Sequence, residues 1–153
     1  MSPDELKEVL RRIPTGVAVL TVDAGGQRIG LTVATLVSLS LEPPLVGVAV
    51  ARQAAIHELL REAGECAFSL LAADQQPVAE HFARGVPPIG MWQGVAVRDT
   101  PGPPLLEGGL GWLVCRVHAE LPAGTHTFFA CDVVRAEPGR DEAPLVRLDG
   151  RYR

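Results

Sequence analysis

Residues 30–46 read GLTVATLVSLSLEPPLV, and this segment is the most informative about the fold. Threonine, serine, valine and leucine dominate it up to the pair Pro43 and Pro44, a composition typical of a β-strand that proline ends. We therefore expect one long strand over residues 29–41. Residues 45–50, LVGVAV, form a second apolar run, which predicts a strand buried on both faces.

Outward from this stretch, short strands alternate with short helices. Further strands are expected at residues 16–22, 66–71, 110–121, 125–136 and 145–148, and helices at residues 3–12, 54–63 and 75–83. Residues 85–104 predict a long irregular excursion, and residues 151–153 a C-terminal tail. Hairpin turns such as residues 122–124 replace the regular βαβ order of a doubly wound sheet. This order indicates a single domain over residues 1–153, mainly β with short helices, folded as an antiparallel barrel.

Charge and hydropathy exclude several classes of function. The 153 residues carry a net charge of −4 with a pI near 5.5, and they lack the basic stripe with interleaved aromatic residues that predicts nucleic-acid binding. No apolar run reaches the roughly 18–20 residues of a membrane helix. The acidic start MSPDEL lacks the order of a signal peptide. We therefore expect a cytoplasmic protein that binds neither nucleic acid nor a membrane.

The apolar content predicts a packed core and an apolar surface that is buried in a subunit interface. Hydrophobic residues make up 47% of the chain, which leaves little spare polar surface and favours a buried interface in a homodimer. Cys66, Cys115 and Cys131 are far apart in sequence and form no CxxC pair. We expect them to be buried structural thiols rather than disulfide partners or zinc ligands.

The sequence carries no self-contained catalytic motif. His57 and Glu58 begin a zinc-protease pattern, but Arg61 stands where the second histidine belongs. Residues 25–30 miss the glycine spacing of a dinucleotide-binding turn, and neither a phosphate loop nor a GxSxG elbow occurs. The four histidines show no metal-ligand spacing. We expect no metal site and no catalytic residue, so that a bound cofactor would carry any chemistry.

Residues 30–46 also have the composition expected beside a flat ligand. A tricyclic ring with polar atoms along one edge needs backbone N–H groups, small hydroxyls and little side-chain bulk beside it. Thr32, Ala34, Thr35 and Ser38 meet that need. The alternative is a barrel strand whose hydroxyls face water.

A set of segments in the same order resembles the flavin reductase-like family. This family has a Greek-key split β-barrel of the FMN-binding type and includes the reductase components of two-component aromatic monooxygenases. The segments that carry the resemblance span essentially the whole chain: residues 14–17, 30–33, 38–46, 68–75, 104–108, 112–117 and 150–153.

The resemblance implies where a flavin would lie. Its isoalloxazine ring would follow Thr32, Val33, Ala34 and Thr35, with Ser38 nearby. Its phosphate would lie at the start of the second helix, a place where free N–H groups attract anions, and beside a second segment further along the chain. The residues implied for the phosphate are Ala51, Arg52, Gln53, Ala54, Phe82 and Arg84.

This chain departs from the family at three places. Ala34-Thr35 replaces the frequent Asn-Ser, and the segment from Gln53 to Ala55 lacks the usual hydroxyls. At the nicotinamide side, the family's Gly-Asp-His is here Gly124-Thr125-His126, so we expect His126 to lose an orienting partner. The family has a tyrosine near the cofactor at the position of Tyr152. The alternative is that Tyr152 lies in a frayed C-terminus and contacts no ligand.

The resemblance implies an enzyme that uses NADH or NADPH to reduce FMN, or FAD, by hydride transfer to flavin N5. The reduced flavin would then serve a partner monooxygenase. One rival is an electron carrier that holds FMN tightly and has no NAD(P)H activity. A second is a module that binds or senses heme or another flat ligand on the same barrel. A pyridoxamine phosphate oxidase-like enzyme shares the architecture but not the segments above.

Overall fold

The computed structural model describes residues 1–84 and 87–153. Its strands are β1 (Thr15–Gly16), β2 (Ala18–Ala24), β3 (Gln27–Val33), β4 (Val37–Leu41), β5 (Pro44–Ala51), β6 (Glu65–Leu70), β7 (Gly111–Ala123), β8 (His126–Pro138), β9 (Val146–Leu148) and β10 (Arg151–Tyr152). Its helices are α1 (Pro3–Leu10), α2 (Ala55–Ala63), the 3-10 turn η1 (Ala73–Gln75), α3 (Gln76–Ala83) and α4 (Pro88–Met91).

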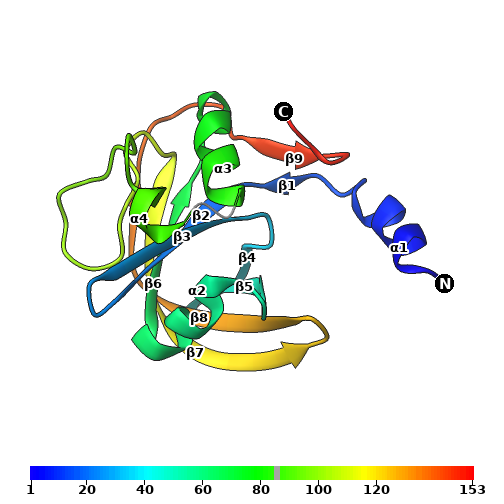
Figure 1. Cartoon of the computed structure of the whole chain (residues 1–153), viewed down its shortest axis with the longest axis horizontal. Helices are drawn as coiled ribbons and strands as arrows, with labels where there is room; N and C mark the ends of the chain where they lie inside the picture. Colours follow the sequence, from blue (N-terminus) through cyan, green and yellow to red (C-terminus); the bar gives the residue numbers. More distant parts are fainter. Residues whose placement is uncertain (85–86) are drawn as a thin grey trace.

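Seven strands form one antiparallel sheet in the order β3-β2-β6-β7-β8-β5-β4. The two edge strands, β3 and β4, follow each other in the chain, so the sheet curls round into a split barrel (Figure 1). Helix α2 packs on β2, β3 and β6, whereas α3 packs on β3 and β2. A small sheet, β1-β9-β10, joins the N-terminal segment to the C-terminal tail. The expected antiparallel barrel with short helices is confirmed.

The expectation of one long strand over residues 29–41 is wrong, because this segment forms two strands. β3 ends at Val33 and β4 begins at Val37. Between them the Thr35 hydroxyl donates to the backbone oxygen of Ala49 (2.9 Å) and accepts from its N–H (3.2 Å). A threonine side chain thus takes the place of a ladder partner and turns the chain from one sheet edge to the other.

Other expectations are corrected at element ends. The tail is not free, because Arg151 and Tyr152 form β10 on β9. The β7–β8 hairpin turns at Gly124 and Thr125, since β7 continues through Ala123. The excursion expected over residues 85–104 contains α4; its first two residues lie outside the described part of the chain. Strand β5 is buried at some positions and only half-buried at others, not covered on both faces throughout.

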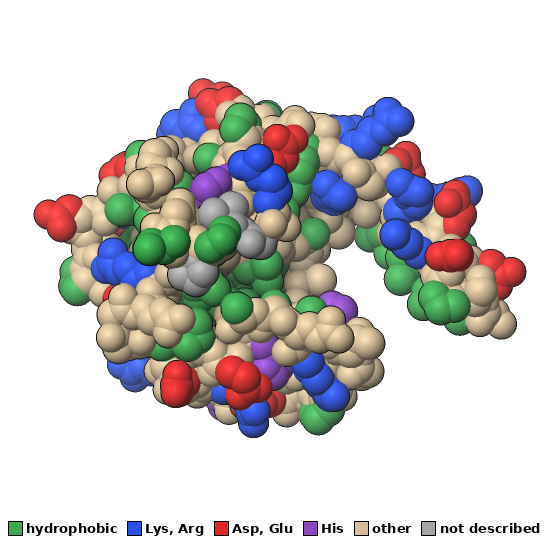
Figure 2. Space-filling view, in the orientation of Figure 1, with side chains coloured by type: hydrophobic (Ala, Val, Ile, Leu, Met, Phe, Trp, Pro, Cys, Tyr) green, Lys and Arg blue, Asp and Glu red, His purple; other side chains and the backbone are tan. Residues whose placement is uncertain are grey.

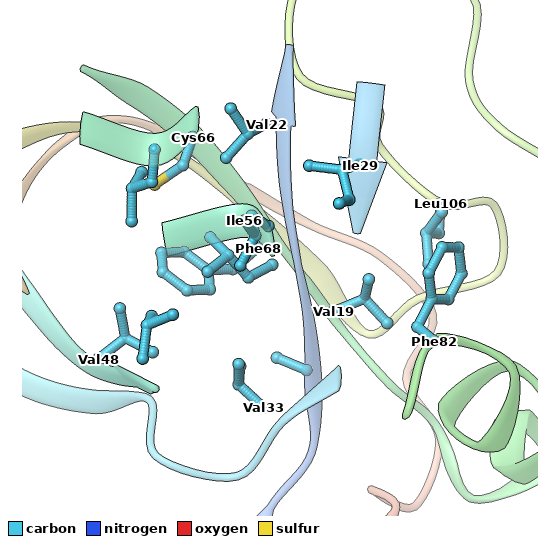
Figure 3. Packing of buried hydrophobic residues seen from close by; sticks show 14 of the residues in the cluster. Val19, Val22, Ile29, Val33, Val48, Ile56, Cys66, Phe68, Phe82 and Leu106 are labelled. Atoms are coloured by element: carbon cyan, nitrogen blue, oxygen red, sulfur yellow. The ribbon is translucent and has the colours of Figure 1, made fainter. Parts of the chain in front are cut away.

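Strand β2 divides the buried core (Figure 3). Ile56 and Phe68 fill the barrel on one side of the strand, and Phe82 and Leu106 pack on the other side beside Val19. Each of these side chains is at most 2% exposed. Because Phe82 belongs to α3, the second part of this core fixes α3 on the outside of the barrel.

The three cysteines are free and buried, as expected. Cys66 on β6 lies opposite Cys115 on β7. Contacts with the side chains of Cys115 and Cys131, together with burial, raise the pKa of the Cys66 thiol well above its ordinary value. The Cys66 thiol therefore behaves as a small core residue.

Helix α1 is well capped but packs on little of the chain. The Ser2 hydroxyl accepts from the N–H of Glu5, and the Glu5 carboxylate accepts from the N–H of Ser2, which completes a capping box. None of its residues is buried, and the helix stands away from the barrel (Figure 1). Among the described residues no helix is long and apolar enough to cross a membrane.

Candidate functional site

A hollow of about 340 Å³ lies between the start of α2 and strand β3. On one side it is lined by Gln53 and Ala54, which precede α2, and by Ala55, the first residue of α2; on the other side it is lined by Gly30 and Leu31 of β3. Ala54 holds the N-cap position of α2 in an extended conformation, and no side chain in the described chain caps the helix. The His57 N–H donates to the backbone oxygen of Ala54 at 3.0 Å, so the N–H groups of Ala55 and Ile56 are the ones at this helix start that an anion could use.

Phe82 forms the wall of this hollow on the α3 side. Its ring packs against Gly30, where a Cβ atom would lie 2.9 Å from two ring carbons. The ring also meets the Trp92 ring, with 5.3 Å between centroids. A side chain at position 30 would push the phenyl ring out of place, so the absence of a Cβ there shapes the hollow.

The hydroxyls proposed for the flavin ring are partly used by the fold. The Thr32 hydroxyl donates to the backbone oxygen of Ala79 on α3 at 2.6 Å, and the Thr35 hydroxyl is paired with Ala49. Ser38 on β4 is exposed. Thr32 and Thr35 therefore position the connection between β3 and β4, and a flat ligand would meet backbone groups and Ser38 there.

The strand pairing brings Arg52 close to His126, the histidine expected at the nicotinamide side. Ala51 on β5 lies opposite His126 on β8, and the N–H of Arg52 donates to the backbone oxygen of Thr125 at 3.0 Å. The Arg52 side chain is exposed. The segment expected at the phosphate and the turn expected at the nicotinamide thus meet at one end of the barrel.

His126 has an orienting partner after all. The Thr125 hydroxyl lies 2.9 Å from His126 Nδ1, so the expectation that this histidine loses its partner with the acid is wrong. A hydroxyl fixes the ring without adding charge. Because Nδ1 faces Thr125, Nε2 remains for a ligand.

A buried histidine that the sequence reasoning rejected as a metal ligand connects α2 with β8. His57, 4% exposed, lies with Nε2 2.8 Å from the Thr127 hydroxyl and Nδ1 2.9 Å from a Glu58 carboxylate oxygen. Its hydrogen bond lowers the pKa of Glu58. Thr127 follows His126 directly, so this bond couples the helix start to the strand that carries His126.

A second hollow, of about 620 Å³, lies between α3 and the C-terminal tail. Arg84, expected at the flavin phosphate, and Tyr152, expected near the cofactor at the nicotinamide side, both line it. Two arginines that the sequence reasoning missed, Arg147 and Arg151, line it as well. The pairing of β9 with β10 brings Arg147, Arg151 and Tyr152 together. No local sequence motif signals that pairing.

Five of the expected site residues line the two hollows. Gln53, Ala54 and Phe82 share the first hollow, and Arg84 and Tyr152 share the second. The uncapped start of α2 fits a phosphate, and the apolar wall of the first hollow fits the less polar parts of a flavin. The residues present are thus compatible with the group that the sequence resemblance implies.

Comparison with known proteins gives a consistent result. The chain is 37% identical to the reductase component of 4-hydroxyphenylacetate 3-monooxygenase of Thermus thermophilus, over 98% of this chain and 95% of the relative. It is 35% identical to the NADH:FMN oxidoreductase of Rhodococcus qingshengii, over 97% of this chain and 79% of the relative.

A solved structure agrees with these relatives. The NADH:FAD oxidoreductase SgcE6 of Streptomyces globisporus C-1027, in complex with NAD and FAD fragments, superimposes with a TM-score of 0.92 at 32% identity. The superposition covers 98% of this chain and 90% of SgcE6. Residues 10–153 match the family described as the flavin reductase like domain. The chain therefore belongs to the flavin reductase-like family.

Proposed function

We propose that this protein is an NAD(P)H:flavin oxidoreductase that reduces FMN. The observation that carries the proposal is the first hollow, which lies between the uncapped start of α2 and strand β3. One end of that arrangement suits a phosphate and the other a flat ring. When both molecules are bound, the nicotinamide supplies a hydride that the flavin accepts at N5.

The chain's own role is to bind and orient. The first N–H groups of α2 hold the phosphate of FMN, and the exposed Arg52 guanidinium adds a forked donor pair. Phe82, fixed by its contact with Gly30, limits how far the flavin enters. Val33 and Ala34 present a backbone with little side-chain bulk, so the ring lies close to the β3–β4 connection.

His126 orients the nicotinamide. Thr125 holds Nδ1, which leaves Nε2 to bond a polar group of the nucleotide. No proton transfer by a side chain is needed for hydride transfer, because holding the two rings within reach accounts for the rate. This agrees with the absence of a familiar catalytic motif in the sequence.

The same geometry favours release of the reduced flavin. Ala54 and Ala55 offer no hydroxyl to the phosphate, so the flavin is held by fewer directional bonds than a Ser or Thr segment would give. Free reduced flavin suits a supply role. We therefore propose a flavin-dependent monooxygenase as the partner, in the cytoplasm, where three free thiols are stable.

A homodimer completes the proposal. Apolar side chains of α1 and β4 that reach solvent suggest where two copies meet, and the most exposed are Val9 (63%), Leu10 (51%) and Leu41 (89%). Covering such a surface is favourable by about 25 cal/mol for each Å². We expect light scattering to give twice the chain mass, and Val9→Asp with Leu41→Asp to shift the protein towards the monomer. A wild-type monomer at micromolar concentration contradicts this part.

Steady-state kinetics test the activity. Purified protein with NADH or NADPH and catalytic FMN should oxidise the nucleotide well above the rate without protein, with saturation in both substrates. Arg116→Gln, an exposed change on β7 away from both hollows, serves as control and should leave the rate unchanged. No nucleotide oxidation with FMN or FAD would remove the proposal.

A further inference from the structure

Met91 brings a thioether sulfur into the wall of the first hollow. It is the last residue of α4 and is 4% exposed, and it lines the hollow together with Ile29 and Phe82. The three cysteines, each 0% exposed, are not among the described residues that line this hollow. Among those residues Met91 therefore carries the one sulfur that borders the hollow.

The Met91 sulfur has a backbone partner on β3. The buried Gly30 N–H donates to Met91 Sδ at 3.2 Å, and β3 is an edge strand of the large sheet. A thioether sulfur is a weak acceptor, so this N–H is held by a weak bond. The bond depends on the unmodified thioether, because nitrogen and sulfur are already in contact.

Two further hydrogen bonds attach the same segment to α3 and β3. His81 Nε2 donates to the backbone oxygen of Met91 at 2.6 Å. Trp92 Nε1 donates to the backbone oxygen of Arg28 at 3.0 Å. Hydrophobic side chains gather around α4 on the face shown in Figure 2. Met91 thus lies among the contacts that hold α4 against β3, so a change at its sulfur affects both α4 and the hollow.

The proposed activity supplies an oxidant for this sulfur. Dioxygen takes two electrons and two protons from reduced flavin and becomes hydrogen peroxide, while the flavin returns to its oxidised form. Hydrogen peroxide then converts a thioether to a sulfoxide. In that step the O–O bond breaks, one oxygen bonds to sulfur through a sulfur lone pair, and the other oxygen leaves as water. The sulfur is oxidised by two electrons and the peroxide is reduced by two.

We propose that Met91 is a site of reversible oxidation by hydrogen peroxide, and that its sulfoxide lowers the affinity of the first hollow for flavin. The sulfur of a sulfoxide carries a partial positive charge, so it no longer accepts from the Gly30 N–H. The new oxygen is polar and needs space beside Ile29 and Phe82, which displaces α4 from β3.

This modification gives the enzyme feedback. When reduced flavin is not consumed by an oxygenase, peroxide accumulates, and the oxidised protein then binds less flavin. Methionine sulfoxide reductases reverse the change. The inference rests on the proposed function for the source of the peroxide, whereas the oxidation site rests on the contacts of Met91.

Mass spectrometry tests the site. The chain has two methionines, and Met1, 94% exposed, is the reference sulfur. A methionine introduced by Leu121→Met, at a position 61% exposed, replaces Met1 as reference if Met1 is removed in the cell. Protein is incubated in air with FMN and NADH or NADPH, and separately with added hydrogen peroxide alone. We expect a sulfoxide at Met91 in both samples, and peptide fragmentation distinguishes it from oxidation of Trp92.

FMN titration of the treated protein, without nucleotide, tests the consequence. After peroxide treatment the dissociation constant of the wild-type protein should rise about tenfold or more, and methionine sulfoxide reductases should restore it. Met91→Leu keeps the size of the side chain but has no sulfur, and it retains all three cysteines. Its dissociation constant, whatever its starting value, should not change on treatment.

Two further measurements do not depend on that comparison. Met91→Gln places a polar group at the sulfur position and should bind FMN weakly before any treatment. Hydrogen exchange at the Gly30 amide, which loses its acceptor, should be faster in the oxidised wild-type protein. If Met91→Gln folds poorly by circular dichroism, the wild type and Met91→Leu carry the test.

Three results overturn the inference. The first is an unmodified Met91 under conditions that fully oxidise the reference methionine. The second is an unchanged FMN affinity after complete oxidation of Met91. The third is an equal loss of affinity in Met91→Leu, which would assign the effect to another residue. If added peroxide oxidises Met91 and weakens FMN binding, but incubation with nucleotide and FMN oxidises neither methionine, the proposed function is contradicted and the oxidation site is not.

Discussion

The two ends of the candidate site are organised by different forces. At the α2 end, the hollow is bounded by the uncapped helix start and by the Phe82 ring on Gly30, and the buried His57–Thr127 bond lies next to it in sequence. At the α3–tail end, the hollow is open and its lining is rich in arginine without carboxylate partners among the described residues.

This difference predicts different responses to mutation and to salt. Buried contacts at the α2 end contribute to folding, so changes there lower the stability as well as the affinity for ligand. Exposed arginines contribute little to folding, because surface charges are screened by water and ions. Changes at the α3–tail end should therefore alter ligand affinity alone, and that affinity should fall with ionic strength.

The largest expected effect is at Phe82, which is shared by the core and the first hollow. Phe82→Ala removes a ring that is 2% exposed and should lower the free energy of unfolding by about 3–5 kcal/mol. Urea unfolding measures it. Phe82→Leu keeps most of the volume and should cost clearly less. Equal stability of wild type and Phe82→Ala would show that this wall is not part of the core.

Substitution of His57 tests whether its buried hydrogen bond with Thr127 stabilises the α2 end. His57→Leu leaves the Thr127 hydroxyl buried without its partner, which should lower the free energy of unfolding by about 1–3 kcal/mol. Thr127→Val in the His57→Leu background removes the unpaired hydroxyl and should restore part of the loss. If the two single changes add without coupling in this double-mutant cycle, the bond does not connect α2 with β8.

Arg52 separates the effect of charge from the effect of burial at the α2 end, because its side chain is exposed there. Arg52→Ala should weaken FMN binding by about 1–3 kcal/mol and leave the unfolding free energy unchanged. Fluorescence titration of FMN measures the affinity at low and at high salt, and Arg116→Ala is the control. An unchanged dissociation constant would remove Arg52 from the phosphate site.

The smallest effect is expected at His126. His126→Ala should slow flavin reduction by bound NAD(P)H several-fold while it weakens FMN binding less, since the proposed contact of this ring is with the nicotinamide only. Thr125→Val, which removes the 2.9 Å partner of Nδ1, should have a weaker effect of the same kind. If both rates remain those of the wild type, His126 has no role in the reaction.

Much of the fold follows from local patterns. The proline pair, the capping glycine at Gly64 and the apolar runs predict the elements, because each depends on a few neighbouring residues. The break between β3 and β4 was missed, since the Thr35–Ala49 bond joins residues 14 apart and leaves no local sign.

The site was predicted less completely than the fold. The resemblance grouped Gln53, Ala54 and Phe82 at the flavin phosphate, and the structure places these three in one hollow, but the resemblance gave no sign that Arg84 and Tyr152 share another. Arg147 could not be singled out, because a guanidinium near the chain end is indistinguishable from a solvated charge until β9 pairs with β10. Residues that act through tertiary contacts leave no signature in spacing alone.

The central claim is that bound flavin receives a hydride directly from NAD(P)H on this protein. We would mix the protein loaded with FMN with NADH, and separately with NADPH, in an anaerobic stopped-flow instrument and follow the flavin absorbance. We expect rapid loss of the oxidised flavin band, faster than for free FMN, and a rate that saturates with nucleotide concentration. A flavin that stays bound and oxidised with both nucleotides would contradict it and would favour an electron carrier.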